Sequence, residues 1–198
     1  MNILGLVDKV PTQRGFTTIF SHKDGKISQL VYQKNQIMDS ITLCAAQLFG
    51  GSVLYKAGAM YFEYQNLASE GDDPTPPSFD KSDGIEYFTG LQYSADVDFI
   101  RAPILVSPSI SETDDGYLLT LYAVTPGEET GFWGKPFDAV NNSAVYGGAV
   151  VATPVPDTQS NDIVIARNYP TGAKVLKAPG EQICMVWNIE FLNPESGS

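Results

Sequence analysis

The sequence contains one histidine, His22, and two cysteines, Cys44 and Cys184, among its 198 residues. Zinc sites, cupin-type metal sites and histidine-assisted nucleophiles need more imidazole or thiolate groups than this. Two cysteines so far apart also do not make a disulfide framework, and we expect free, buried thiols in a chain that folds in a reducing cytosol. His22 lies beside a predicted turn, where a histidine is normally solvated. We therefore predict no enzymatic activity and no bound cofactor.

Basic residues are also few. Twelve Lys and Arg stand against 23 Asp and Glu, which gives a formal net charge of −11. Binding to nucleic-acid phosphates or to anionic membrane surfaces needs clustered positive charge, so we expect neither partner. No apolar stretch approaches the roughly 20 residues of a membrane span. The N-terminal residues have no basic start and no cleavage site, so we expect no targeting segment.

The acidic residues crowd two predicted loops. One loop holds Asp72, Asp73, Asp80 and Asp83, and the other holds Glu112, Asp114 and Asp115. Asp is favoured in turns, and both groups lie beside Gly or Pro. The spacing is not that of an EF-hand, and glycosidase carboxylates usually lie on strands inside a cleft. We interpret both groups as turn residues, with structural calcium in the loop from Glu70 to Asp83 as the alternative.

Short apolar runs bounded by Gly, Pro or Asp fill the chain from Leu54 to Phe191, and this pattern is typical of antiparallel sheets. The run from Ile183 to Phe191 alternates strictly, so Trp187 should be buried on its odd-numbered face. Gly147 and Gly148 inside one run indicate a bulge or a close backbone approach. The fold class that we predict is mainly β, an antiparallel β-sandwich. The expected strands are Ala59 to Tyr64, Gly84 to Phe88, Phe99 to Val106, Tyr117 to Val124, Ala144 to Thr153, Asp162 to Asn168 and Gln182 to Leu192.

One helical pattern stands out near the N-terminus. Ile37, Ile41, Cys44 and Leu48 recur on a single stripe, which predicts an amphipathic helix from Gln36 to Phe49. The length suits a single β domain. We therefore expect an N-terminal arm or hairpin at residues 1–34, one β-sandwich domain at residues 35–192 and a disordered tail at residues 193–198.

The arm has two parts. Phe16 to Phe20 and Ile27 to Tyr32 flank the turn signal Asp24-Gly25, which predicts a hairpin. The residues before Phe16 have no clear period and gain little by folding on themselves, so we expect them to contact a neighbouring subunit. The candidate interface residues of the arm are Ile3, Leu4, Leu6, Val7 and Val10.

A second candidate interface is the pair Phe132 and Trp133, which Gly131 and Gly134 bracket in a predicted loop. Large aromatic side chains between flexible residues are typical of a loop that docks on a partner protein. A lid over the end of the core and a contact with a ligand such as a sugar are the alternatives.

Segments spread over most of the chain resemble poorly characterised virion structural proteins of tailed bacteriophages. They are Asn35 to Ser40, Met60 to Tyr64, Pro76 to Asp80, Gly84 to Phe88, Asp98 to Pro103, Gly134 to Asp138, Asn141 to Gly148, Asp162 to Arg167 and Val186 to Phe191. The resemblance implies a particle component without enzymatic activity. Proteins of this size and β content in such particles are often capsid decoration, or cement, proteins with jelly-roll-like folds.

The expected function is therefore that of a bacteriophage capsid cement protein, which binds the assembled shell and braces it against internal DNA pressure. Its partner would be the major capsid protein, it would form dimers or trimers, and it would lie on the capsid exterior after synthesis in the bacterial cytoplasm. A tail, neck or fibre module that binds host surface glycans is the first alternative. A glycan-degrading enzyme is the second, and it needs two facing carboxylates in a cleft.

Overall fold

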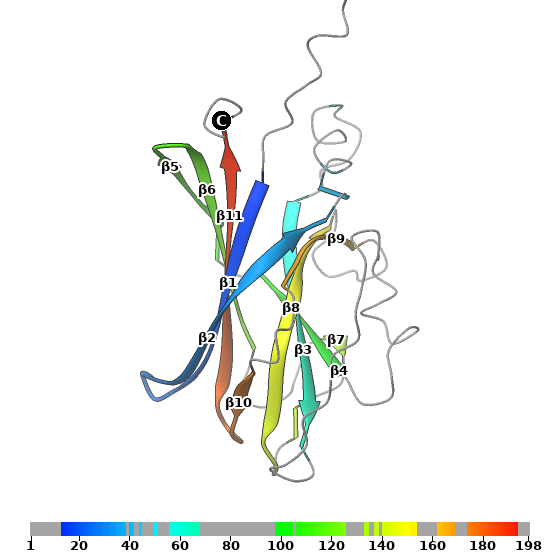
Figure 1. The fold of residues 1–198 in the computed structure, drawn as a ribbon. Coiled ribbons are helices and arrows are strands. Elements are labelled where there is room, and N and C mark those ends of the chain that lie inside the picture. The colour runs from blue at the N-terminus through cyan, green and yellow to red at the C-terminus, as the bar shows by residue number, and fades with distance from the viewer. Residues whose placement is uncertain are drawn as a thin grey trace, which may run out of the picture.

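The chain is mainly β and forms two antiparallel sheets in the computed structural model (Figure 1). The structure describes residues 13–38, 40–41, 44, 50, 56–67, 98–104, 106–125, 133–134, 137–138, 140–153, 162–168 and 174–193. The strands are β1 (Gln13–Lys23), β2 (Lys26–Ile37), β3 (Lys56–Asn66), β4 (Asp98–Pro103), β5 (Ser109–Thr113), β6 (Gly116–Val124), β7 (Trp133–Gly134), β8 (Ser143–Thr153), β9 (Ile163–Asn168), β10 (Val175–Lys177) and β11 (Gln182–Leu192).

The strands form one hydrogen-bonded path that folds into two layers. Its order is β5-β6-β11-β1-β2-β9-β8-β3-β4-β7, with β10 paired to β8, and every pairing is antiparallel. We call β5, β6, β11, β1 and β2 the first sheet, and β9, β8, β3, β4 and β7 the second sheet. Strand β2 joins them, because it pairs with β1 along most of its length and with β9 through residues 35–37.

The predicted N-terminal hairpin is confirmed. Asp24 and Gly25 have φ angles of 51° and 78°, the left-handed backbone that a tight two-residue hairpin turn needs. Strand β1 also pairs with β11, from Gln13 opposite Phe191 to His22 opposite Gln182. The boundary expected after Lys34 falls inside β2, and residues 13–34 therefore belong to the sheet system and are not a separate arm.

The main core lies between the two sheets and confirms the predicted register of β11. Ile183, Met185, Trp187 and Ile189 are buried in it, and the side chain of Trp187 has no exposed surface. Met60 and Phe62 of β3 belong to the same cluster. Alternation in β11 therefore identified the face that packs against the other sheet.

Most expected strands agree with β3, β4, β6, β8, β9 and β11 to within a few residues. Residues 84–88, where another strand was expected, lie outside the described part of the chain. Strands β5, β7 and β10 were not predicted. Strands β7 and β10 are only 2 and 3 residues long, and β5 consists of 5 exposed residues without an apolar run.

The predicted helix begins too early. Gln36 and Ile37 are the last residues of β2, where they pair with Arg167 and Ala166 of β9. Most of residues 39–49 lie outside the described part, so the helix from there on stays a prediction. Among the described residues, no helix has the length and apolar character needed to cross a membrane. Cys44 and Cys184 are free and buried, as expected.

Candidate functional site

The second sheet is buried on both faces. Met60, Phe62 and Tyr64 of β3 point into the main core, while the alternating residues Tyr61 and Glu63 point to the opposite face. These two side chains are also almost fully buried, at 0% and 1% exposure. The second face therefore encloses polar groups, and it is where the ionisable side chains of the described sheets concentrate away from solvent.

Two arginines lie in one row across this face. The register places Arg101 of β4 opposite Tyr61 of β3, Tyr61 opposite Ala149 of β8, and Ala149 opposite Arg167 of β9. Both arginines are buried, at 1% and 0% exposure. A buried guanidinium is costly unless it is paired and hydrogen-bonded, so each needs an acidic partner on the same face.

Arg101 finds its partner in Asp162, which immediately precedes β9. The guanidinium donates from Nε to Oδ2 at 2.6 Å and from Nη2 to Oδ1 at 2.9 Å, a bidentate pair. The hydroxyl of Tyr61 donates to the same Oδ2 at 2.8 Å. Burial by itself lowers the pKa of Arg101, but the hydrogen bonds and negative charge of Asp162 outweigh burial and raise that pKa above its ordinary value.

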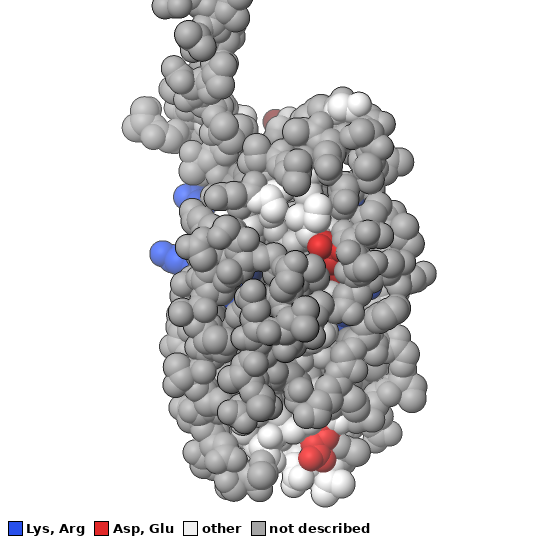
Figure 2. All heavy atoms as spheres, turned by 90° about the vertical axis from the view of Figure 1, so that its right-hand side faces the viewer, with Lys and Arg blue, Asp and Glu red and all other residues white. Residues whose placement is uncertain are grey.

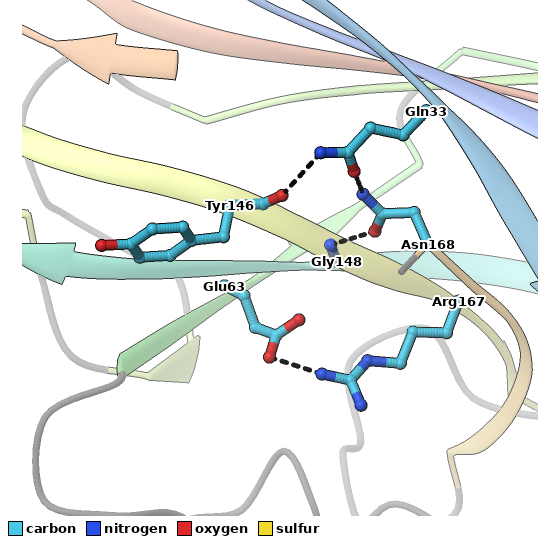
Figure 3. Close-up of polar contacts among 6 residues, drawn as sticks. All are labelled: Gln33, Glu63, Tyr146, Gly148, Arg167 and Asn168. Atoms are coloured by element: carbon cyan, nitrogen blue, oxygen red, sulfur yellow. Dashed lines mark hydrogen bonds and ion pairs between the residues drawn. The ribbon is translucent and has the colours of Figure 1, made fainter. Parts of the chain in front are cut away.

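Arg167 pairs with Glu63 across the intervening strand, through one hydrogen bond where Arg101 and Asp162 have two. Its Nη2 donates to Oε1 of Glu63 at 2.6 Å (Figure 3). Strand β8 lies between the two residues, and there it carries Gly147 opposite Glu63 and Ala149 opposite Arg167. The small side chain of Ala149 leaves room above β8 for the long side chains to meet.

An amide network lies on the other side of β8 from Glu63 and Arg167, and it reaches β2 (Figure 3). Asn168 of β9 accepts a hydrogen bond from the backbone N–H of Gly148 and donates through Nδ2 to Oε1 of Gln33 (Figure 3). Gln33 in turn donates to the carbonyl of Tyr146 at 3.3 Å. Tyr146 is the extra residue of a β-bulge, since the register jumps from Glu63 opposite Gly147 to Tyr64 opposite Val145.

The two glycines of β8 are required by close approaches. A Cβ built on Gly148 would lie 1.8 Å from the carbonyl oxygen of Tyr61, and one on Gly147 would lie 2.6 Å from Nδ2 of Asn168. Both expectations for this pair, a bulge and a close backbone approach, are confirmed.

The chemistry of this cluster is that of charge neutralisation. Two arginines and two carboxylates pair within one buried face, and each pair bridges strands that are distant in sequence. In the view onto this side of the molecule, described acidic atoms reach the surface only at separate points (Figure 2). We therefore interpret the cluster as a structural device that fixes how β3, β4 and β9 are aligned.

Most of the residues that the sequence predicted as interface or loop residues lie outside the described part of the chain. Ile3, Leu4, Leu6, Val7, Val10 and Phe132 lie there, and of Trp133 only the backbone is placed, as part of β7. Asp72, Asp73, Asp80 and Asp83 are also outside. Asp114 and Asp115 form the turn between β5 and β6, as predicted, whereas Glu112 lies in β5 opposite Tyr117 and is not a turn residue. Within the described residues, no group of three or more His, Cys, Asp or Glu could hold a metal ion.

The buried ion pairs were missed at the level of sequence. The signal that could have found them is a single charge inside an apolar strand pattern: Glu63, Arg101 and Arg167 each interrupt such a run. Together with Asp162, these residues make two positive and two negative charges, which is the balance that two buried ion pairs need.

The first sheet carries a different kind of surface. Ile27, Leu30 and Tyr32 of β2 are 57%, 58% and 60% exposed. The register places them on one face of the sheet, with Phe16 and Phe20 of β1 next to them, and the rings of Phe16 and Tyr32 are 5.5 Å apart. We call these five residues the β2 apolar stripe. Large exposed apolar groups that are contiguous mark protein interaction sites more often than scattered ones do.

Comparisons of this chain with models of protein families, with curated proteins and with solved structures found no match.

Proposed function

We propose that this chain is a non-enzymatic structural protein that acts by binding other proteins through the surface of its β-sandwich. The observation that carries the proposal is the β2 apolar stripe. It presents three large side chains that are more than half exposed, on a strand that pairs with β1, which in turn pairs with β11. Burying such groups against a partner contributes roughly 25 cal/mol per Å² before the costs of association are subtracted.

The buried charges support the same proposal. Arg101, Asp162, Glu63 and Arg167 are engaged with one another, and they stiffen the second sheet. A rigid scaffold with an apolar outer stripe loses little conformational freedom on binding, which suits a protein that must hold neighbours in place.

We further propose that the partner is the major capsid protein of a tailed bacteriophage and that the chain is a cement protein on the capsid exterior. This step rests on the sequence resemblance, and the two-sheet β architecture is compatible with the jelly-roll type that the resemblance implies. Self-association into dimers or trimers would raise the effective affinity for a symmetric shell without any new type of contact.

The deciding experiment counts the protein in purified virions. A cement protein is present in hundreds of copies per particle, whereas a tail, neck or fibre module is present in a handful, so gel staining relative to the major capsid protein separates them. We expect a ratio in the range of the shell protein itself. A few copies per particle would indicate a tail, neck or fibre module instead of a cement protein. Absence of the protein from particles would overturn the virion proposal.

A second experiment tests where the shell contact lies. Residues 1–12 precede β1, so removing them leaves every described strand intact. If these residues clamp a neighbouring subunit, the truncated protein should keep its melting temperature and lose binding in co-sedimentation with capsids. Tyr32→Ser replaces an exposed ring of the β2 apolar stripe with a small polar side chain, and it tests that surface in the same co-sedimentation assay. Wild-type affinity in both variants would show that neither surface binds the shell.

A further inference from the structure

We propose that copies of this chain associate head to tail, with the edge strand β2 of one copy docking against the edge strand β5 of the next. The inference concerns contacts between copies in solution and does not depend on the capsid proposal. It assigns a partner, a second copy of this chain, to two open and chemically opposite edges of the first sheet.

Both edges are open within the described part of the chain. Strand β5 is the first strand of the sheet path and pairs with β6 alone, and all five of its residues are exposed. In β2, Lys26, Ile27 and residues 29–35 pair with β1 on one side, and the pairing with β9 is confined to residues 35–37. The side chains of Ser28 and Gln29 hydrogen-bond to Glu181 and to the N–H of Leu176, but no further described strand pairs with the backbone there. Residues 26–30 are all exposed. Open edges of this kind present unpaired backbone groups and are templates for adding a strand.

The two edges lie on opposite sides of the sheet. Three strands, β6, β11 and β1, separate β5 from β2. In Figure 1 the β5–β6 hairpin and the tip of the β1–β2 hairpin point to opposite ends of the sheet. One copy can therefore offer β2 to a neighbour on one side and β5 to another neighbour on the other.

The β2 edge is basic and apolar. Lys23, Lys26 and Lys34 are exposed on the β1–β2 hairpin, where Asp24 is the one acidic residue. This local excess of positive charge stands out in a chain whose formal net charge is −11. The β2 apolar stripe lies beside it, so the edge combines attraction for an acidic surface with area to bury.

The β5 edge is acidic and apolar. Glu112 and Asp114 are exposed on the β5–β6 hairpin, which carries no Lys or Arg between residues 109 and 124. Ile110 and Tyr117 are 71% and 53% exposed on the same hairpin. It therefore offers the charge and the apolar area that the β2 edge needs.

Charge decides between the pairings that two open edges allow. A symmetric β2–β2 contact would bring the three lysines of each copy together, and a β5–β5 contact would do the same for carboxylates. Like charges across an interface cost binding energy, whereas opposite charges raise the association rate and fix the register. The β2–β5 pairing is the one with opposite charges. Because it joins two different surfaces, it produces a ring if the rotation closes and a filament if it does not.

The experiment uses charge reversal on each edge of the full chain. Sedimentation velocity over a concentration series gives the association constant of the wild type. Lys26→Glu/Lys34→Glu makes both edges acidic, and Glu112→Lys/Asp114→Lys makes both edges basic. Each variant alone should associate at least about tenfold more weakly than the wild type. Mixing the two variants makes every β2–β5 contact between them attractive again, so association should return.

Controls keep the outcome interpretable. Lys56→Glu makes the same change at an exposed lysine on β3 and should leave association unchanged. Melting temperatures of all variants near that of the wild type exclude unfolding, and the single change Glu112→Lys replaces the double variant if the turn at Asp114 does not tolerate lysine.

A monomeric wild type at all concentrations overturns the proposal, as does wild-type association in Glu112→Lys/Asp114→Lys, which would show that the β5 edge takes no part in the contact. Failure of the mixed variants to reassociate would also overturn it. The assay contains this protein only, so any of these results leaves the capsid proposal to be decided by particle counting.

Discussion

Arg101 and Asp162 form a bidentate ion pair in which neither side chain has more than 1% of its surface exposed. The two residues lie on opposite sides of β3 and β8 in the strand order, because Arg101 is on β4 and Asp162 leads into β9. Their contact therefore spans the middle of the second sheet and ties together strands that do not hydrogen-bond to each other.

Breaking this pair on one side should be strongly destabilising. Asp162→Asn leaves a buried guanidinium without its counter-charge, and we expect a loss of about 3–5 kcal/mol in the free energy of unfolding. The double change Arg101→Met/Asp162→Leu removes both charges and should lose clearly less stability than Arg101→Met and Asp162→Leu lose in sum. Urea denaturation of Asp162→Asn, of these two single variants and of the double variant measures both quantities.

The exposed pair between Arg14 and Glu190 is the control for this cycle. Arg14 is 63% exposed, and solvent screens the interaction. We expect Arg14→Met to leave the free energy of unfolding nearly unchanged, because solvent screens an exposed ion pair. A loss in Asp162→Asn as small as that in Arg14→Met would contradict the structural role assigned to the buried pair.

Gly148 should tolerate no side chain. A Cβ there meets the backbone carbonyl of Tyr61, which cannot move without disturbing the pairing of β3 with β8. We expect Gly148→Ala to destabilise the fold by about 3 kcal/mol or more, at the upper end of overpacking effects. Gly50→Ala is the control, since nothing lies within 4 Å of a Cβ at that position. Equal melting temperatures for the two variants would show that the close approach is not as described.

Trp187 should be one of the largest single contributors to the core. Its side chain is fully buried, and Trp187→Ala is expected to lower the free energy of unfolding by about 3–5 kcal/mol. Tyr32→Ala removes an aromatic ring that is 60% exposed, and the change should be within about 0.5 kcal/mol for the isolated protein. Thermal melting at low protein concentration compares them, and a shift of only a degree or two for Trp187→Ala would refute the register of β11.

Both thiols should be protected in the folded protein. Burial raises the pKa of Cys44 and of Cys184, and in Cys184 a hydrogen bond from the Tyr122 hydroxyl partly offsets this rise. The thiolate is the reactive form, so a thiol reagent at mildly alkaline pH should modify neither residue until denaturant is added. Fast modification of either residue in the native state would contradict its burial.

The raised pKa values also fix the sign of a pH effect. The folded state favours the protonated thiols, so their contribution to stability is complete below the pKa of the unfolded thiols and is lost as pH rises through the folded values. The phenol of Tyr122 acts in the same direction, since burial and then its contact with Cys184 raise its pKa to about 12. Unfolding midpoints measured from neutral pH upward should fall in wild type and fall less in Cys184→Ala.

Local patterns predicted what depends on neighbouring residues. The alternation in β11 identified the buried face, and Asp24-Gly25 identified the hairpin, because pleating and turn geometry are encoded within a few residues. The end of β2 was misread because Gln36 and Ile37 fit a helical stripe equally well. Their pairing with β9, 130 residues further along the chain, decides their conformation.

The candidate site shows the same limit. Arg101 and Glu63 were visible as charges in apolar runs, but their partners depend on which strands are neighbours, and no local pattern contains that order. The β2 apolar stripe was likewise hidden, since Ile27, Leu30 and Tyr32 read as ordinary strand residues. They are exposed because no other described strand packs on that side of the hairpin, which is a property of the assembled sheet.

The pairing of β1 with β11 has a consequence for how this protein is made. Arg14 and Glu190 are 176 positions apart, so β1 cannot pair with β11 until the residues between them have been synthesised. Until then Ile19, which is buried in the core of the folded protein, belongs to a hairpin that lacks this neighbouring strand. Folds dominated by such long-range contacts form slowly. During that interval the apolar face of the hairpin is exposed, and exposed apolar strands are prone to aggregate.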